Sequence, residues 1–135
     1  MATVTLIEYE DASSEVRAIY DDIRAVRKTD FINNFWKALA NNPDQLRRTW
    51  DGIKEVMAPG ALDPLTKELI YIAVSVANKC EYCIHSHTAA ARAKGMSDDQ
   101  YAELMSVIGM ALSTNGLVTT MQVAVDDAFK ADGVE

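Results

Sequence analysis

Apolar residues recur every three or four positions along most of the chain, which is the spacing of one face of an α-helix. After an extended lead-in over residues 1–12, the pattern predicts helices on the apolar stripes Val16–Val26, Phe31–Leu39, Leu46–Met57, Leu65–Val76, about 81–94, Tyr101–Leu112 and Val118–Phe129. The sequence contains no linker, repeat or low-complexity tract. We therefore expect a single compact all-α domain of about six to seven helices over residues 1–135.

Residues that start or stop helices stand between the stripes. Ser13 or Ser14 can cap the first helix, and Pro43 suits the first turn of the third. Asp63–Pro64 pairs a capping aspartate with a proline at the first helical position, and Ser97–Gln100 fits a capping box. The other break signals are Pro59–Gly60, Gly95, Asn115–Gly116 and Asp132–Gly133. In the last two helices we expect the inward-facing residues to be Tyr101, Leu104, Met105, Ile108, Leu112, Val118, Met121, Val125, Ala128 and Phe129.

The segment after Asp63–Pro64 fits two patterns. Its β-branched residues alternate like a strand, whereas Leu65, Leu69, Ile72 and Val76 follow helical spacing. We interpret it as a buried helix, because it has a cap signal, a length of about fourteen residues and no partner strand elsewhere.

All the cysteines and histidines of the chain lie within eight positions, as Cys80, Cys83, His85 and His87. These residue types supply soft nucleophiles, proton transfer near neutral pH and metal ligands. Packing alone does not explain their concentration, so we expect the function to be located here.

The composition of the chain limits its partners and its location in the cell. Twenty acidic and thirteen basic residues give a formal charge of −7, which argues against nucleic acid or an anionic membrane as a partner. The longest apolar run, near Leu69–Ala77, is too short to cross a bilayer, and the first residues do not have the pattern of a targeting signal. We expect a cytoplasmic protein, in which the two cysteines rest as thiols rather than as a purely structural disulfide.

The spacing of the motif favours a dithiol that cycles. Two cysteines three residues apart at a helix start can form a disulfide, and the helix N-terminus favours a thiolate. A thiolate attacks a peroxide O–O bond to give a sulfenic acid, which a neighbouring thiol converts to a disulfide. His87 lies one turn beyond Cys83 on the same face and can move a proton, whereas His85 is rotated by about 200° and points to solvent or a subunit interface.

Glu68 can join this group if the chain reverses direction. A straight helix would separate it from Cys80 by roughly 18 Å, but a helical hairpin turning near Asn78–Lys79 brings it level with His87. There its carboxylate would orient the imidazole or accept the thiol proton. Taken alone, Glu68 is better explained as a surface carboxylate near the start of a helix.

Other uses of the motif remain as alternatives. A zinc site would draw all four ligands from eight consecutive residues, which one helix cannot arrange tetrahedrally. Haem attachment needs a histidine where Ile84 stands, and a thioredoxin-like fold needs strands and a later proline. We assign Tyr71, Tyr82 and the methionines to the core.

The spacing E-x11-C-x2-C-x3-H, from Glu68 to His87, resembles the AhpD-like alkylhydroperoxidases of the carboxymuconolactone decarboxylase superfamily. The resemblance covers residues 40–95 best. It implies an all-α homo-oligomer, a trimer or a hexamer. It also implies that Cys83 is the peroxidatic thiol, Cys80 its resolving partner, and Glu68 with His87 the proton relay.

One position departs from this pattern. The best-studied members have a histidine immediately before the second cysteine, where this chain has Tyr82, a poor base at neutral pH; His85 is a candidate substitute. Helix-end electrostatics alone would make Cys80 the more acidic thiol, whereas the resemblance assigns the attack to Cys83.

The resulting expectation is a thiol-dependent peroxidase that needs no cofactor or metal, and that is regenerated by an external dithiol donor. The alternatives are a thiol-disulfide oxidoreductase without peroxidase activity, and a non-catalytic metal-binding or redox-sensing module.

Overall fold

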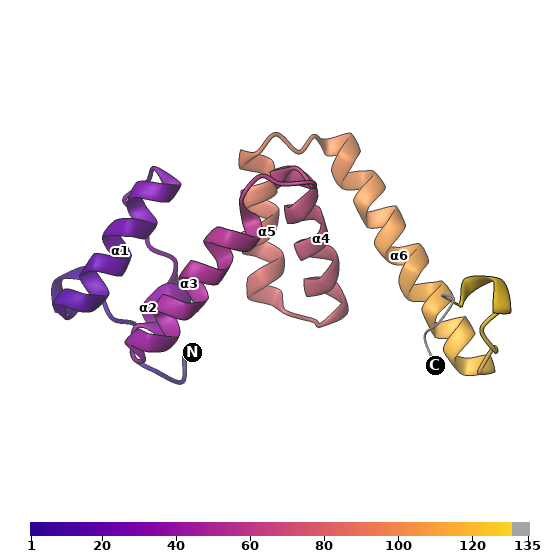
Figure 1. The fold of residues 1–135 in the computed structure, drawn as a ribbon, viewed down its shortest axis with the longest axis horizontal. Coiled ribbons are helices and arrows are strands. Elements are labelled where there is room, and N and C mark those ends of the chain that lie inside the picture. Colours follow the sequence, from indigo (N-terminus) through magenta and orange to yellow (C-terminus); the bar gives the residue numbers. More distant parts are fainter. Residues whose placement is uncertain (131–135) are drawn as a thin grey trace. The chain divides into compact units, whose positions relative to one another are not determined.

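The computed structural model describes residues 1–130, and all regular structure in this range is helical (Figure 1). The all-α class is therefore confirmed. The α-helices are α1 (Ser14–Arg27), α2 (Asn34–Leu39), α3 (Pro43–Met57), α4 (Pro64–Ala77), α5 (Glu81–Ala93) and α6 (Asp98–Met121), and the short 3-10 helices are Tyr9–Asp11 and Asp127–Phe129. The predicted break at Asp132–Gly133 lies outside the described residues.

The chain forms two compact units, residues 1–58 and residues 59 onward, and each has a hydrophobic cluster of its own. The first unit packs α1, α2 and α3 around buried side chains that include Tyr20, Trp36 and Trp50. The two tryptophan rings meet edge to face, with their centroids 5.5 Å apart. The assignment of residues 1–135 to one domain stays a prediction.

Side-chain caps begin the helices where the sequence predicted them. The Ser13 hydroxyl accepts a hydrogen bond from the backbone N–H of Val16 at the start of α1. Asp63 accepts one from Thr66, with Pro64 at the first position of α4. Ser97 and Gln100 form the reciprocal capping box of α6. Each cap satisfies a backbone donor that the first helical turn leaves unpaired.

The second unit contains the predicted helical hairpin of α4 and α5, which lie side by side (Figure 1). The chain reverses after Asn78, where Lys79 takes a left-handed backbone conformation with φ 57°. The backbone N–H of Cys80 then donates to the carbonyl of Ser75 at 2.9 Å, which closes the turn. The interpretation of the ambiguous segment as a helix is thus confirmed, but its full burial is not, because Ile70 and Val74 are 48% and 53% exposed.

The hairpin buries Ile72, Ala91 and Met96, and the first half of α6 adds partly buried side chains to the same cluster, namely Tyr101, Leu104 and Ile108. Beyond Ile108, every described residue of the chain is exposed. Met105, Leu112, Val118, Met121, Val125, Ala128 and Phe129, which we expected to face inward, are exposed as well.

The predicted break at Asn115–Gly116 is wrong, and so is the separate last helix, because α6 continues to Met121. Asn and Gly each disfavour a helix by only about 1 kcal/mol or less relative to alanine, and neither blocks the backbone hydrogen bonds as proline does. The residues on either side favour a helix, and their preference outweighs the cost of Asn115 and Gly116.

By length and composition, α6 is the one helix within residues 1–130 that could cross a membrane, and none of its apolar window is buried in the structure. The apolar pattern did not indicate this, because the predicted break at Asn115–Gly116 divides the segment into two shorter helices. No charged residue occurs between Glu103 and Asp126.

Candidate active site

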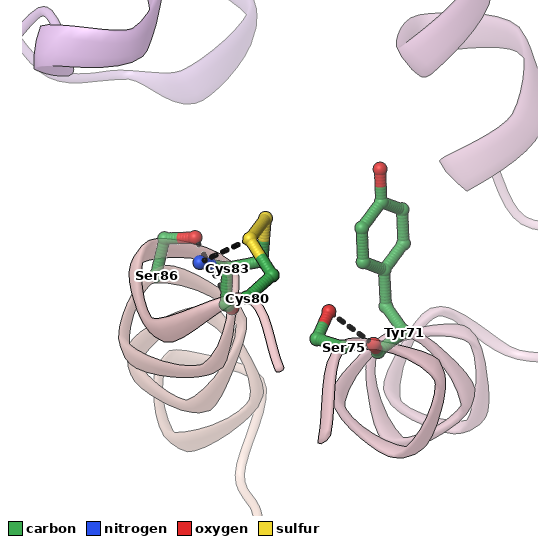
Figure 2. Close-up of a disulfide and its surroundings, with 5 residues drawn as sticks. All are labelled: Tyr71, Ser75, Cys80, Cys83 and Ser86. Carbon is green, nitrogen blue, oxygen red and sulfur yellow. Dashed lines mark hydrogen bonds between the residues drawn. A yellow bond between two sulfur atoms is a disulfide. The ribbon is translucent and has the colours of Figure 1, made fainter. Parts of the chain in front are cut away.

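Cys80 and Cys83 form a disulfide at the start of α5. Cys80 is the residue that caps the helix, and its sulfur accepts a hydrogen bond from the backbone N–H of Cys83 at 3.3 Å. Their Cα atoms lie 5.3 Å apart, within the normal range for a disulfide. Figure 2 shows the disulfide on the side of α5 that faces α4, with the ring of Tyr71 projecting from α4. The prediction that the pair can close a disulfide is therefore confirmed.

Glu68 and His87 meet across the hairpin, as the sequence predicted. The Nδ1 atom of His87 lies 2.7 Å from Oε2 of Glu68, whose residue is only 4% exposed. An ionised carboxylate only accepts hydrogen bonds, so Nδ1 of a neutral His87 carries the ring proton and Nε2 is left able to accept another. Cys83 lies one helical turn before His87 on α5, and the two side chains therefore share a face.

Glu68 has a second partner that its sequence spacing did not predict. The Nζ atom of Lys94, the C-cap residue of α5, donates to Oε1 of Glu68 at 2.8 Å. Burial is the largest influence on the pKa of Glu68 and raises it, but the hydrogen bonds from His87 and Lys94 together outweigh it and lower the pKa. Glu68 is therefore a buried and ionised carboxylate at neutral pH, with one partner on each oxygen.

Tyr71 also belongs to this group, although we had assigned it to the core. Its ring stacks on the ring of His87, with centroids 3.6 Å apart and an interplanar angle of 20°. Ser75 donates a hydrogen bond to the backbone carbonyl of Tyr71 at 2.7 Å (Figure 2). Helical spacing could have found both missed residues, since Tyr71 is three positions after Glu68 and Lys94 is seven positions after His87.

Tyr82 and His85, the possible auxiliary residues of the site, both lie at the surface, so the assignment of Tyr82 to the core is wrong. Tyr82 is 45% exposed in the first turn of α5, immediately before Cys83. His85 is exposed as well, in keeping with its predicted rotation away from Cys83. Among residues 1–130, no three His, Cys, Asp or Glu side chains cluster closely enough to hold a metal ion.

The fold and site together define a helical protein with a C-x-x-C disulfide beside a buried carboxylate–imidazole pair. Residues 43–126 match the profile of the carboxymuconolactone decarboxylase family. The chain therefore belongs to the carboxymuconolactone decarboxylase family, as an AhpD-like member. The resemblance inferred from the motif is confirmed.

Three relatives show which proteins the chain resembles. The crystal structure of the alkylhydroperoxidase AhpD core from Rhodospirillum rubrum ATCC 11170 is 58% identical, with a TM-score of 0.95 over 98% of this chain and 99% of that one. "Uncharacterized protein 4 in cox locus" from Paracoccus denitrificans is 43% identical over 54 residues, which are 40% of this chain and 49% of that protein. "Alkyl hydroperoxide reductase AhpD" from Solibacter usitatus (strain Ellin6076) is 33% identical over 72 residues, which are 53% of this chain and 39% of that protein. The chain thus spans less than half the length of the two curated relatives.

Proposed function

We propose that this protein is a thiol-dependent peroxidase that reduces hydroperoxides through a dithiol/disulfide cycle. The observation that carries the proposal is the Cys80–Cys83 pair one helical turn from a buried Glu68–His87 hydrogen bond. The name of the Solibacter usitatus relative and that of the Rhodospirillum rubrum structure also favour peroxide chemistry. The C-x-x-C pair favours this redox branch of the family over the decarboxylation in the family name.

In the first step, the Cys83 thiol gives its proton to Nε2 of His87, and the resulting thiolate attacks the terminal oxygen of the hydroperoxide. The O–O bond breaks, the sulfur is oxidised to a sulfenic acid, and the leaving alkoxide takes the proton to become an alcohol. Glu68 holds the imidazole through Nδ1 and stabilises the imidazolium that forms between the two transfers.

In the second step, the thiolate of Cys80 attacks the sulfur of the sulfenic acid, and hydroxide leaves as water once protonated. The product is the Cys80–Cys83 disulfide, the oxidised form of the enzyme. An external dithiol donor then supplies two electrons and two protons and becomes a disulfide itself. The balance is one hydroperoxide and one dithiol consumed for one alcohol, one water and one disulfide.

The place of Cys83 on the helix supports the assignment of attack to this residue. Cys83 shares a face with His87, whereas Cys80 caps the helix one turn earlier. Cys80 benefits more from the helix terminus, but only Cys83 is within one turn of the relay. Tyr82 and the exposed His85 serve at most as auxiliary hydrogen-bond donors.

The direct test is a count of free thiols in the reduced protein before and after one equivalent of an organic hydroperoxide. We expect the parent to lose both thiols, and a sulfenic-acid trap to label Cys80→Ser but not Cys83→Ser. A Cys83→Ser variant that consumes hydroperoxide as fast as the parent rules the proposal out.

A second candidate is a thiol-disulfide oxidoreductase that does not react with peroxides. The observation that favours it is Tyr82, which stands where the best-studied AhpD-like enzymes have a histidine. In that case the thiols survive the hydroperoxide but are lost to a small disulfide. The same thiol count therefore distinguishes the two candidates. A metal-binding or redox-sensing module, the non-catalytic alternative, would show bound zinc or a change of assembly on oxidation, without turnover.

The proposal includes a homo-oligomer, a trimer or a hexamer, in the cytoplasm. The support for the homo-oligomer is α6, which exposes Met105, Val107, Met110, Leu112, Leu117, Val118 and Met121. So many exposed apolar side chains on one helix are typical of a surface that contacts another protein. A cavity of about 220 Å³ between α4, α5 and α6, lined mainly by apolar side chains, adjoins the same helix.

A further inference from the structure

Lys94 holds Glu68 from the end of the helix that carries His87. Its backbone N–H bonds the carbonyls of Ala90 and Ala91 at 3.1 Å, so the helix end fixes its position. Its Nζ atom lies 2.8 Å from Oε1 of Glu68, while His87 occupies Oε2. A lysine at a helix C-terminus often serves only to offset the helix dipole. Here the ammonium instead reaches a carboxylate whose side chain is only 5% exposed.

We propose that Lys94 is a positioning residue of the relay, whose positive charge balances and holds the Glu68 carboxylate while Glu68 orients the His87 imidazole that accepts the Cys83 proton. The inference rests on the proposed thiol chemistry. It assigns Lys94 a role in proton transfer that it exerts through Glu68, without contact with the reacting sulfur.

The charges of the site explain why this balance matters. Before the transfer, the neutral thiol and imidazole add nothing, and Glu68 and Lys94 cancel. After the proton moves from Cys83 to His87, the thiolate and the imidazolium also cancel, so the total stays at zero. Without Lys94 the site carries one negative charge in both states. This unbalanced charge makes the loss of a proton from the site less favourable. Thiolate formation at Cys83 then requires a higher pH.

The other charged and polar groups named around the hairpin contact other partners. The hydrogen bonds that lower the pKa of Glu68 come from His87 and Lys94. On α4 itself, the ammonium of Lys67 lies near Gly60, and Tyr71 faces His87 through its ring. From α6, Tyr101 joins the apolar cluster and Asp98 pairs with Arg92.

The test measures the pH dependence of Cys83 alkylation by iodoacetamide in the reduced Cys80→Ser protein. We compare Lys94→Met, which keeps an unbranched side chain but removes the charge, with Lys94→Arg, which keeps the charge. We expect the midpoint of the alkylation profile to rise by about 0.5–1 pH unit in Lys94→Met, since one nearby charge is lost from a partly exposed position. Lys94→Arg should restore the parent profile.

Arg92→Met is the matched control, because it removes a positive charge two residues away that pairs with Asp98 rather than Glu68. Its profile should coincide with that of the parent. A midpoint in Lys94→Met equal to the parent's, or an equal shift in Arg92→Met, overturns the inference. A merely structural role for Lys94 lowers the melting temperature without moving the midpoint.

The same variants separate this inference from the proposed function. Hydroperoxide consumption at pH 7 should fall several-fold in Lys94→Met and be retained in Lys94→Arg. If the parent fails to consume hydroperoxide but the alkylation midpoint still shifts in Lys94→Met, the peroxidase proposal is wrong and the role of Lys94 in the relay stands.

Discussion

The aromatic ring of Tyr71 stacks on the imidazole of His87, with the ring centroids 3.6 Å apart. Glu68 holds one edge of that imidazole and Tyr71 covers one of its faces, so two residues of α4 together fix a ring that belongs to α5. Stacked rings of this kind contribute about 0.5–1.5 kcal/mol beyond their buried area. The imidazole is therefore held in one orientation before any substrate arrives.

We expect Tyr71→Phe to keep this orientation and to consume hydroperoxide at nearly the parent rate, because the stacking needs the ring and not the hydroxyl. Tyr71→Leu should lower the rate about ten-fold, since an imidazole free to rotate is aligned with the thiol for less of the time. Steady-state peroxide consumption at saturating dithiol measures both. A greater loss in Tyr71→Phe than in Tyr71→Leu would instead assign the role to the hydroxyl.

Glu68 should make the stability of the protein depend on pH. Its partners lower its pKa in the folded state, so its contribution is fully present above the unfolded pKa of about 4.3 and is lost as the pH falls through the lower folded value. Glu68→Gln keeps the shape but removes the charge, and we expect it to cost about 1–2 kcal/mol at pH 7. Urea unfolding of both oxidised proteins from pH 7 to pH 2 measures the difference.

The stability difference between the parent and Glu68→Gln should change with pH in one direction. The gap between the parent and Glu68→Gln should narrow as the pH falls below about 4, where the carboxylate of the parent takes up a proton. A gap that stays unchanged down to pH 2 would mean that the charge of Glu68 contributes nothing to stability, against the ion pair with Lys94.

Sequence reasoning could predict the hairpin and the Glu68–His87 pair because both depend on local signals. The cap at Asp63 and the turn at Asn78–Lys79 fix the lengths of the two helices, and helix geometry then sets which residues come level. Lys94 and Tyr71 share the same periodicity, but a lysine near a helix end and a tyrosine in an apolar segment each have an ordinary explanation. Only the contacts in the structure distinguish Lys94 and Tyr71 from other lysines at helix ends and other tyrosines in apolar segments.

The error in α6 has a different origin. Asn115–Gly116 is a strong turn signal in an isolated peptide, whereas a long helix absorbs its small cost. The pattern of inward-facing residues was also misleading, because apolar side chains such as Met105 and Leu112 are exposed within a single chain. A face that meets another molecule and a face that meets the core have the same sequence pattern.

The exposed face of α6 gives a prediction for the assembly. Met110 is 65% exposed, so Met110→Glu should leave the fold of one chain intact but place a charge in an apolar contact between copies. We expect the mass measured by light scattering to fall from that of a trimer or hexamer towards that of one chain. Val26→Glu, which charges a residue of α1 that is 53% exposed, serves as the control and should stay assembled. A parent protein that is monomeric, or that binds lipid vesicles through α6, contradicts the proposed homo-oligomer.

Two glycines should respond in opposite ways to the same substitution. Gly116 lies inside α6, and a Cβ added there meets no atom within 4 Å, so Gly116→Ala should stabilise the protein by about 0.5–1 kcal/mol through the higher helix propensity of alanine. Gly95 follows α5 with a φ of 96°, which an L side chain rarely adopts, so Gly95→Ala should destabilise by about 1 kcal/mol or more. Urea unfolding at pH 7 measures both changes. If Gly116→Ala were destabilising instead, α6 would either break at Asn115–Gly116, as its sequence alone predicts, or meet a second chain too closely at that point to admit a methyl group.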